Sequence, residues 1–330
     1  MGSPGNEPDR AASVAGADPE DVSENRGFPP GNPHLLVPAR PRSAALAGLS
    51  LYDAVTTKQR VVLRLGKVAA RGGLVPALPR VAAGAQSPSQ EWWQEWLAAV
   101  ACPVVGPVRF RPRLTSDGRV RCLLLSANGT PLAFAKVVAS AEADGLRHEA
   151  AVDALLAENR PPRSVLHVPR LLRHGALDGW EYLLFESLPD LGHRPLPGDP
   201  RTVARVADAI QSALSGLAGG AGRTDHVPGH GDFTPRNARL TAGGEVWVVD
   251  WEYAQWMPRL ADELRFWAAQ GAMGLQLRRL DSRAQDIFAT LRTRGTVADI
   301  LEAVRWPEYN TPAERAVRDR VEALARDRSS

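Results

Sequence analysis

Short runs of alternating apolar and polar residues occupy the middle of the chain, and helical patterns occupy its last third. Three such runs, VRFRPRL, VRCLLLS and PLAFAKVV, lie between Val108 and Val138, and the turn sequences TSDGR and ANGT separate them. Two further runs follow in VPRLLRHG and WEYLLFESL, and the chain turns mainly helical from Asp199 onward. Strand runs followed by helix runs are typical of α+β proteins, so we expect such a fold with an antiparallel three-strand meander.

Two charged residues at the end of this meander suggest a site. Lys136 lies in the middle of the apolar third strand, in a chain whose only other lysines are Lys58 and Lys67 among 40 basic residues. An ammonium group is a compact point charge, so a lysine in this arginine-rich chain suggests a specific partner. The next segment, DGLRHEAAVDALLAENR, predicts a helix with Glu149 at the edge of its apolar face. We expect Glu149 to pair with Lys136, although a snorkelling lysine and a solvated glutamate are the structural alternatives.

The first third of the chain divides by composition. Residues 1–35 are rich in Gly, Pro, Asp, Glu and Ser without an apolar period, which predicts a disordered acidic tail. Residues 36–105 are expected to form a helical extension ahead of the strand region. Between 36 and 80 the charge reverses, with eight basic residues against Asp53 alone.

Residues 60–71 of this basic stretch predict an amphipathic helix. At 100° per residue its basic side chains form a stripe about 60° wide, and its apolar face is centred about 120° round from that stripe. The stripe holds Arg60, Arg64, Lys67 and Arg71, and the apolar face holds Val61, Leu65, Val68 and Ala69. Either the helix packs on the folded domain with its basic edge in water, or residues 58–71 dock on an anionic membrane surface or a protein partner.

A second helix is predicted in SPSQEWWQEWLAAV. Ser87 is its expected N-cap, with Pro88 in the first turn and Gln90 closing a capping box. Trp92 and Trp96 share one face of this helix. An aromatic face at helical spacing more often packs in a core than binds a ligand, so we assign these tryptophans to packing.

Length, charge and cysteine content narrow the class of protein. The chain has 330 residues, 44% of them hydrophobic, enough for one large or two ordinary domains. No apolar run reaches about 18 residues and the start lacks a signal-peptide pattern, so we expect a cytoplasmic protein. The net charge of +3 is too small to favour nucleic acid as a partner. Cys102 and Cys122 form no CxxC pattern, which argues against a disulfide framework or a thiolate metal site.

The octet HGDFTPRN, residues 230–237, predicts a shaped loop. Asp232 and Asn237 are five residues apart, which places their side chains about 140° apart on a helix and on opposite faces of a strand. Pro235 also biases Thr234 toward an extended conformation. If both polar side chains point into one site, only a loop brings them there.

A hairpin is predicted directly after this loop, in ARLTAGGEVWVVD, with Gly243 and Gly244 as a two-residue turn. In that register Asn237 lies opposite Asp250, with Cβ atoms about 4.5–5.5 Å apart. An amide oxygen and a carboxylate at this separation can bind one hard cation, and Mg²⁺ is the natural occupant. Asp232 would lie beside the metal, where it could accept a proton from an attacking hydroxyl or orient it.

This combination is the equipment of phosphoryl transfer, which needs a metal, a lysine on the phosphates and an acid that aims the nucleophile. Each residue alone also has a structural explanation, since Asp232 can form a turn and Asn237 can cap a helix. Three polar neighbours have simpler expected roles. Asp262 anchors backbone or caps a helix, and His230 braces the loop. Glu252 could assist the metal site, but most glutamates after a strand end are solvated.

In order and approximate spacing, FAK, HEAAVDALL, YLLFESLP, HGDFTPRN and VVDWE resemble the motifs of the aminoglycoside phosphotransferase and choline kinase family. The resemblance covers roughly residues 106–270 and implies a bilobal protein-kinase-like fold. Its N-lobe and hinge would span 106–190, and its helical C-lobe would span 191–330. By this resemblance Asp232 would be the catalytic acid-base residue, and Asn237 and Asp250 would be metal ligands.

The same resemblance implies a nucleotide site. Lys136 would contact the α- and β-phosphates with Glu149 as its partner, and the hinge from Glu186 to Leu188 would hold the base through its backbone. The loop TSDGR has one glycine rather than the GxGxxG of protein kinases. Its phosphate contacts would therefore come from backbone N–H groups around Ser116 to Gly118.

These residues imply an ATP- or GTP-dependent, Mg²⁺-requiring kinase that phosphorylates a hydroxyl of a small molecule. Gly231, Thr234 and Trp251 stand where protein kinases usually have other residues, which favours a sugar, an amino alcohol or an aminoglycoside-like acceptor. From Asp262 to Ser330 there are 11 acids and 12 arginines, which argues against a polycationic acceptor. The alternatives are a catalytically silent kinase-like module that docks through its basic segment, and a kinase that acts on a protein.

Overall fold

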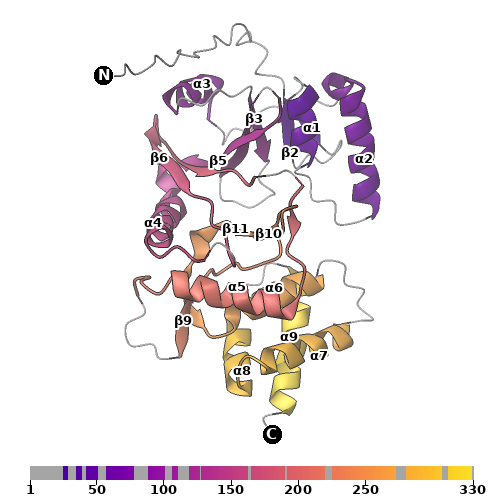
Figure 1. Ribbon diagram of the computed structural model, residues 1–330, viewed down its shortest axis with the longest axis vertical. Coiled ribbons are helices and arrows are strands. Elements are labelled where there is room, and N and C mark those ends of the chain that lie inside the picture. Colours follow the sequence, from indigo (N-terminus) through magenta and orange to yellow (C-terminus); the bar gives the residue numbers. More distant parts are fainter. Residues whose placement is uncertain are drawn as a thin grey trace, which may run out of the picture.

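A computed structural model shows that the protein has two lobes (Figure 1). An antiparallel sheet with flanking helices forms the upper lobe, and a mainly helical lobe lies below it. This arrangement confirms the predicted bilobal α+β fold. The structure describes residues 25–28, 35–38, 42–50, 57–77, 88–100, 106–110, 119–126, 128–162, 165–189, 192–219, 225–272, 280–306 and 311–328.

The sheet of the N-lobe has seven strands in the order β1-β2-β3-β4-β5-β7-β6, and every neighbouring pair is antiparallel. Their bounds are β1 Asn25–Phe28, β2 Leu35–Pro38, β3 Gly106–Phe110, β4 Val120–Leu125, β5 Pro131–Ala139, β6 Leu171–Leu177 and β7 Trp180–Glu186. The predicted meander is confirmed as β3, β4 and β5. The two later strand predictions are confirmed as the hairpin of β6 and β7.

The first two strands correct the expectation of a disordered tail up to residue 35. Residues 25–28 form β1, in which Arg26 and Phe28 are buried, and β1 pairs with β2. β2 in turn pairs with β3, so part of the expected helical extension is a strand of the same sheet. Residues 1–24 lie outside the described part of the chain. β1 has only four residues, and Arg26 and Gly27 occupy two of them. Its alternation of apolar and polar residues is therefore too weak to predict a strand from the sequence.

Helices cover both faces of this sheet. They are α1 Arg42–Ser50, α2 Thr57–Arg71, α3 Gln90–Ala99 and α4 Asp144–Glu158, with short 3₁₀ turns η2 Val75–Ala77 and η3 Ser140–Glu142. Side chains of β4 alternate between two clusters. Leu123 and Leu125 pack with α1 and α2, whereas Cys122 and Leu124 pack with the tryptophans of α3. This alternation explains why the β4 sequence is almost continuously apolar.

The predicted start of α3 was wrong by two residues. The helix begins at Gln90, and the Ser89 hydroxyl caps it by accepting a hydrogen bond from the Trp92 N–H at 3.1 Å. Ser87, the expected cap, lies outside the described residues. The packing role of the tryptophans is confirmed, because Trp92 and Trp96 are buried and stacked with ring centroids 5.8 Å apart.

The basic amphipathic helix predicted over 60–71 is present as α2, but its buried face differs from the expected one. Gly66 and Ala70 face the core, and an added Cβ at Gly66 would lie 2.6 Å from the ring of Phe28. The small residues allow a closer backbone approach than the larger aliphatic residues do. The apolar face named in the sequence is therefore turned outward at Val61, Leu65 and Val68. The side chain of Arg60 lies outside the described part.

The C-lobe contains helices α5 Pro200–Ala213, α6 Ala261–Ala272, α7 Leu280–Arg292, α8 Val297–Arg305 and α9 Pro312–Asp327. Its short strands are β8 Arg194–Pro195, β9 His226–Gly229, β10 Ala238–Leu240, β11 Val246–Val248 and β12 Gln255–Pro258, with the 3₁₀ turn η4 Trp251–Tyr253. β10 pairs with β11 and β8, and β9 pairs with β12. As predicted, α5 begins at Pro200, and Asp199 caps it by accepting from the Thr202 N–H at 2.8 Å.

The largest buried cluster joins the helices of the C-lobe to α4 and to the loops that face the N-lobe. Phe233, within the octet, is fully buried in it beside Phe266 of α6, with ring centroids 5.1 Å apart. The loop is thereby fixed to the helical core. Among the described residues, no helix combines the length and the apolar character that a bilayer crossing requires.

Candidate active site

A cavity of about 240 Å³ lies between the two lobes. Its apolar wall includes Leu123, Phe134, Phe185, Leu188 and Val249. Its polar lining includes Lys136, Glu149, Glu186, Asn237 and Asp250 from both lobes, together with Arg121, His193, Arg236 and Arg239. The cavity thus brings together residues that lie more than 100 positions apart in the chain.

Lys136 lies at the centre of a buried ion-pair group. Its Nζ donates to Glu149 Oε1 at 2.7 Å and to Oε2 at 2.6 Å, and both residues are almost fully buried. Lys136 also contacts a carboxylate oxygen of Asp250, and Glu252 Oε2 is 4.0 Å from Nζ. Glu149 in addition accepts the backbone N–H of Trp251 at 3.2 Å. The carboxylates of Glu149, Asp250 and Glu252 therefore surround Lys136.

The charge states of this group follow from burial and Coulomb interactions. Burial alone would lower the pKa of Lys136, but Asp250, Glu149 and Glu252 outweigh it and raise the pKa. Burial would raise the pKa of Asp250, but Lys136 and Arg121 hold that pKa below its usual range. At neutral pH Lys136 is charged and Asp250 is ionised, so a carboxylate faces the cavity.

Two side chains hold the carboxylate of Asp232, one at each oxygen. The Asn237 amide donates to Oδ2 at 2.8 Å and to the Asp232 carbonyl at 2.9 Å. From α6, Arg265 donates to Oδ1 from Nη2 at 2.8 Å and from Nε at 3.1 Å. Burial raises the pKa of Asp232, and Arg265 opposes that rise. The loop thus brings Asp232 and Asn237 together, although neither helix nor strand could.

As expected, His230 and Asp262 support the backbone of the loop formed by residues 230–237. Asp262 accepts the N–H of His230 at 2.6 Å and that of Gly231 at 3.1 Å. The His230 ring accepts the Asp232 N–H at Nδ1 (3.2 Å), and its Nε2 lies 3.0 Å from the Val249 carbonyl. This pattern fits a neutral ring protonated at Nε2, and burial lowers the pKa of His230 accordingly.

Gly231 is required at its position by geometry. Its φ is 83°, in the left-handed region, and an added Cβ would lie 2.0 Å from the Tyr253 carbonyl oxygen. No side chain fits at that distance. The glycine therefore lets the loop pass directly against η4, next to the Asp250 that precedes that turn.

The hairpin register predicted from the two glycines was wrong by one residue. Ala238 pairs with Val248, and the Val249 N–H donates to the Asn237 carbonyl at 2.9 Å, so Asn237 lies opposite Val249. The turn has three residues, 242–244, because the Thr241 N–H bonds the Glu245 carbonyl at 2.9 Å and Gly244 takes φ 83°.

Asp250 nevertheless lines the same cavity as Asn237. It follows β11 with a left-handed backbone, φ 72° and ψ 59°, which few residues other than glycine adopt. This conformation changes the direction of the chain after the strand. The Asp250 carboxylate reaches Lys136 as a result.

The expected nucleotide residues are only partly within the described chain. Glu186 and Leu188 line the cavity at the end of β7, and the Glu186 N–H donates to the Arg170 carbonyl at 2.8 Å. Ser116 and Gly118 lie outside the described residues.

Sequence reasoning missed two buried charges at this site. Glu252, expected to be solvated, is buried, contacts Arg119 and lies 3.7 Å from Arg121. Arg265 is also buried and pairs with Asp232 and with Glu314 of α9. Arg265 lies between the apolar Leu264 and Phe266 in LADELRFW, which is a sequence signal for a buried arginine, and buried arginines are rare without a partner. Nothing in VVDWE separates a buried Glu252 from a solvated one.

No model of a known protein family matches the chain, and no curated protein matches its sequence. Among solved structures it is similar to aminoglycoside phosphotransferase APH(3'')-Id from Streptomyces rimosus, with 16% identity, a TM-score of 0.41 and coverage of 72% of this chain and 99% of that chain. A thermostable mutant of aminoglycoside phosphotransferase APH(4)-Ia gives 14% identity, a TM-score of 0.43 and coverage of 72% and 99%. Amicoumacin kinase hAmiN, solved with AMP-PNP and Ca²⁺, has 12% identity and a TM-score of 0.35. The match covers 74% of this chain and 95% of that chain. At these identities and TM-scores, the similarity transfers neither a family nor an activity to this chain.

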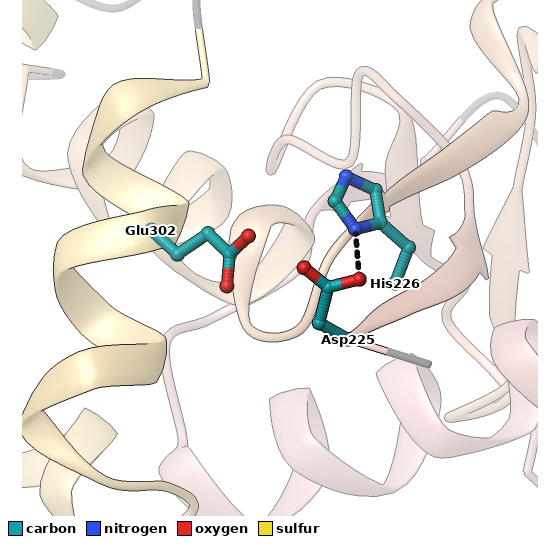
Figure 2. A group of neighbouring side chains, drawn as sticks. All are labelled: Asp225, His226 and Glu302. Carbon is teal, nitrogen blue, oxygen red and sulfur yellow. Dashed lines mark ion pairs between the residues drawn. The ribbon is translucent and has the colours of Figure 1, made fainter. Parts of the chain in front are cut away.

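A second group of ligand-type side chains lies away from the cavity. Asp225 and His226 at the start of β9 face Glu302 of α8 (Figure 2). His226 Nδ1 is 3.1 Å from Asp225 Oδ1. Burial and the neighbouring Asp225 carboxylate raise the pKa of Glu302. The group links β9 to α8 and has no contact with the residues around Lys136 among those described.

Proposed function

We propose that the protein is a Mg²⁺-dependent kinase that transfers the γ-phosphoryl group of ATP or GTP to a hydroxyl of a small molecule. One observation carries the proposal. Asn237, the ionised Asp250 and the Lys136–Glu149 ion pair line one cavity, and Asp232 is hydrogen-bonded to Asn237 beside it. Phosphoryl transfer depends on positioning and charge stabilisation by this set of groups.

The nucleotide would occupy the cavity. Leu123, Phe134 and Val249 offer an apolar slot for the base, and the hinge backbone at Glu186 and Leu188 would contact its edge. Lys136, held by Glu149, would contact the α- and β-phosphates. Backbone N–H groups around Ser116 and Gly118 would add phosphate contacts. A nucleotide-dependent kinase of this kind is consistent with a cytoplasmic protein.

Asn237 and Asp250 fit a magnesium ion by the chemistry of their donor atoms. Mg²⁺ prefers oxygen ligands, and Asp250 supplies an ionised carboxylate at the cavity. The Asn237 amide nitrogen bonds to Asp232, which leaves the amide oxygen as the atom for a metal. A bound metal would neutralise charge on the phosphate oxygens.

Asp232 would be the acid-base residue. The acceptor hydroxyl would give its proton to the Asp232 carboxylate while its oxygen forms a bond to the γ-phosphorus and the bond to the β-phosphate oxygen breaks, which releases the nucleoside diphosphate. Arg265 and Asn237 would hold the carboxylate in place during this transfer. Burial of Asp232 favours proton uptake, because it disfavours the ionised form.

The acceptor is expected to be a sugar or a sugar-like alcohol. The helical region from 262 to 330 has no acidic excess, and three arginines, Arg121, Arg236 and Arg239, line the cavity. A polycationic ligand needs a negative cleft. An aminoglycoside is therefore a weaker candidate than a sugar or an amino alcohol.

A nucleotide-consumption screen over sugars, amino alcohols and aminoglycosides tests the proposal, with the Asp232→Ala variant as the blank. We expect at least one alcohol to raise nucleotide consumption by the wild type and not by the variant, with the phosphate recovered on that alcohol. A protein labelled in place of any small alcohol would indicate a protein kinase. A chain that neither binds nor consumes nucleotide would be the silent module.

A further inference from the structure

Large exposed hydrophobic side chains gather on α2 and the turn after it. Four of the six in the described part of the chain lie here, with Val61 49%, Leu65 64%, Val68 61% and Leu74 61% exposed. The first three fall within about 60° of one another on the helix surface. Single exposed apolar residues are ordinary, but a row of them on one helix face indicates a binding surface.

The packing of the opposite side of α2 fixes this orientation. The helix backbone lies against Phe28 at Gly66, where an added Cβ would be 2.6 Å from the ring, and Ala70 is fully buried. Val62 and Leu63 pack against the same cluster. Rotating the helix to bury Leu65 would force larger side chains into the space that glycine leaves, so the fold itself turns the apolar row outward.

A basic stripe runs beside the apolar row. Arg64, Lys67 and Arg71 are centred about 90° round the helix from it, and both arginines are exposed. No acidic residue occurs between Asp53 and Glu91 in the sequence, so α2 carries no negative charge of its own. Figure 1 shows α2 at the outer edge of the upper lobe.

We propose that the α2 face, defined as Val61, Leu65 and Val68 with Arg64, Lys67 and Arg71, docks on an anionic lipid bilayer. The aliphatic side chains would enter the boundary between headgroups and acyl chains. The basic side chains would meet lipid phosphates at the surface. This proposal is independent of the proposed kinase activity, because no residue of the α2 face lines the cavity.

The composition of the α2 face favours a bilayer over two other occupants. Nucleic acid would use the cations but leave the aliphatic row in water. A second copy paired antiparallel about a two-fold axis would place the basic stripes of both copies side by side, which costs energy. An anionic bilayer can bury the aliphatic row and bind the basic stripe at the same time.

Co-sedimentation of the full chain with lipid vesicles tests this proposal. Vesicles of phosphatidylcholine alone are compared with vesicles that also contain phosphatidylglycerol. We expect binding to be about tenfold or more stronger on the anionic vesicles, and to weaken as salt rises from about 0.1 M to about 0.5 M. The variants Leu65→Glu and Arg64→Gln/Lys67→Gln should each lose most of this binding.

A matched control is Leu172→Glu, which places the same charge on β6 at a side chain that is 44% exposed. It should bind vesicles as the wild type does. All variants change exposed or half-buried positions, and an unchanged far-ultraviolet spectrum and unfolding midpoint would show that they fold. Equal binding to both vesicle types, equal binding by Leu65→Glu, or a solution dimer that Leu65→Glu dissociates would each overturn the proposal.

Discussion

Arg265 on α6 holds Oδ1 of Asp232, with Nη2 at 2.8 Å and Nε at 3.1 Å. The same guanidinium reaches Glu314 of α9 from Nη1 at 3.4 Å, and Glu314 also completes the capping box at the start of that helix. Asp232 is therefore tied to α9 through one buried arginine, and this link restricts the orientation of its carboxylate.

The Arg265–Asp232 pair predicts a strong effect of Arg265→Gln. Removing one partner of a buried ion pair leaves the other charge uncompensated, which costs about 3 kcal/mol of unfolding free energy. We expect transfer to fall more than nucleotide binding does, since Arg265 touches Asp232 and does not line the cavity. The control Glu314→Gln keeps the Arg265–Asp232 contact and should retain most of the turnover. Equal loss of turnover in both variants would mean that Arg265 acts only through the stability of α9.

Asp232 and Asp250 are predicted to fail differently when replaced. Asp232→Ala should leave nucleotide affinity nearly unchanged and reduce turnover by about 10²–10⁴-fold, the usual contribution of an acid-base group. Asp250→Ala removes a proposed metal ligand and a partner of Lys136, so it should weaken Mg-nucleotide binding as well. Calorimetric titration with a non-hydrolysed nucleotide distinguishes the two. The division of roles is wrong if both variants lose nucleotide binding to the same extent.

Gly231 and Gly244 form a matched pair for a stability test, because both have φ 83° but only Gly231 has a close neighbour. Gly244→Ala should cost about 1 kcal/mol, the penalty of a left-handed backbone. Gly231→Ala adds a clash with the Tyr253 carbonyl and should cost about 3 kcal/mol or more. Denaturant unfolding measures both. Similar costs would show that the loop can move away from η4.

The buried neutral His230 predicts a pH dependence of stability. Burial holds the pKa of His230 below its ordinary value of about 6.5, so below that pH the unfolded chain takes up a proton that the folded chain does not. This group therefore lowers the free energy of unfolding as pH falls, by at most about 1.4 kcal/mol per pH unit. The advantage of the wild type over His230→Gln should shrink from about pH 7.5 to about pH 5.5. An advantage that stays constant would show that the histidine protonates in place.

Local patterns were enough to predict the elements around the site. Alternating runs identified β4 to β7, and an unusual lysine in a strand pointed to Glu149 as its partner on α4. The octet predicted a loop from the spacing of Asp232 and Asn237 together with Pro235. These inferences depend on short-range periodicity and on turn chemistry, which the sequence contains directly.

Features that depend on long-range packing were not predictable. The two glycines after β10 allow a two- or a three-residue turn, and a one-residue change moves Asn237 from Asp250 to Val249. The buried face of α2 depends on where Phe28 sits, 38 positions earlier in the chain. The burial of Glu252 depends on Arg119 and Lys136, which come from the other lobe.

Thermal unfolding with ATP and with GTP, in the presence and absence of Mg²⁺, tests most directly whether the cavity is a metal-nucleotide site. We predict that at least one nucleotide raises the unfolding midpoint when Mg²⁺ is present. At a nucleotide concentration of 100 times its dissociation constant, the free energy of unfolding should rise by about 2.7 kcal/mol. Lys136→Ala should remove the shift. A wild-type midpoint that neither nucleotide moves, with Mg²⁺ in excess, would contradict the account.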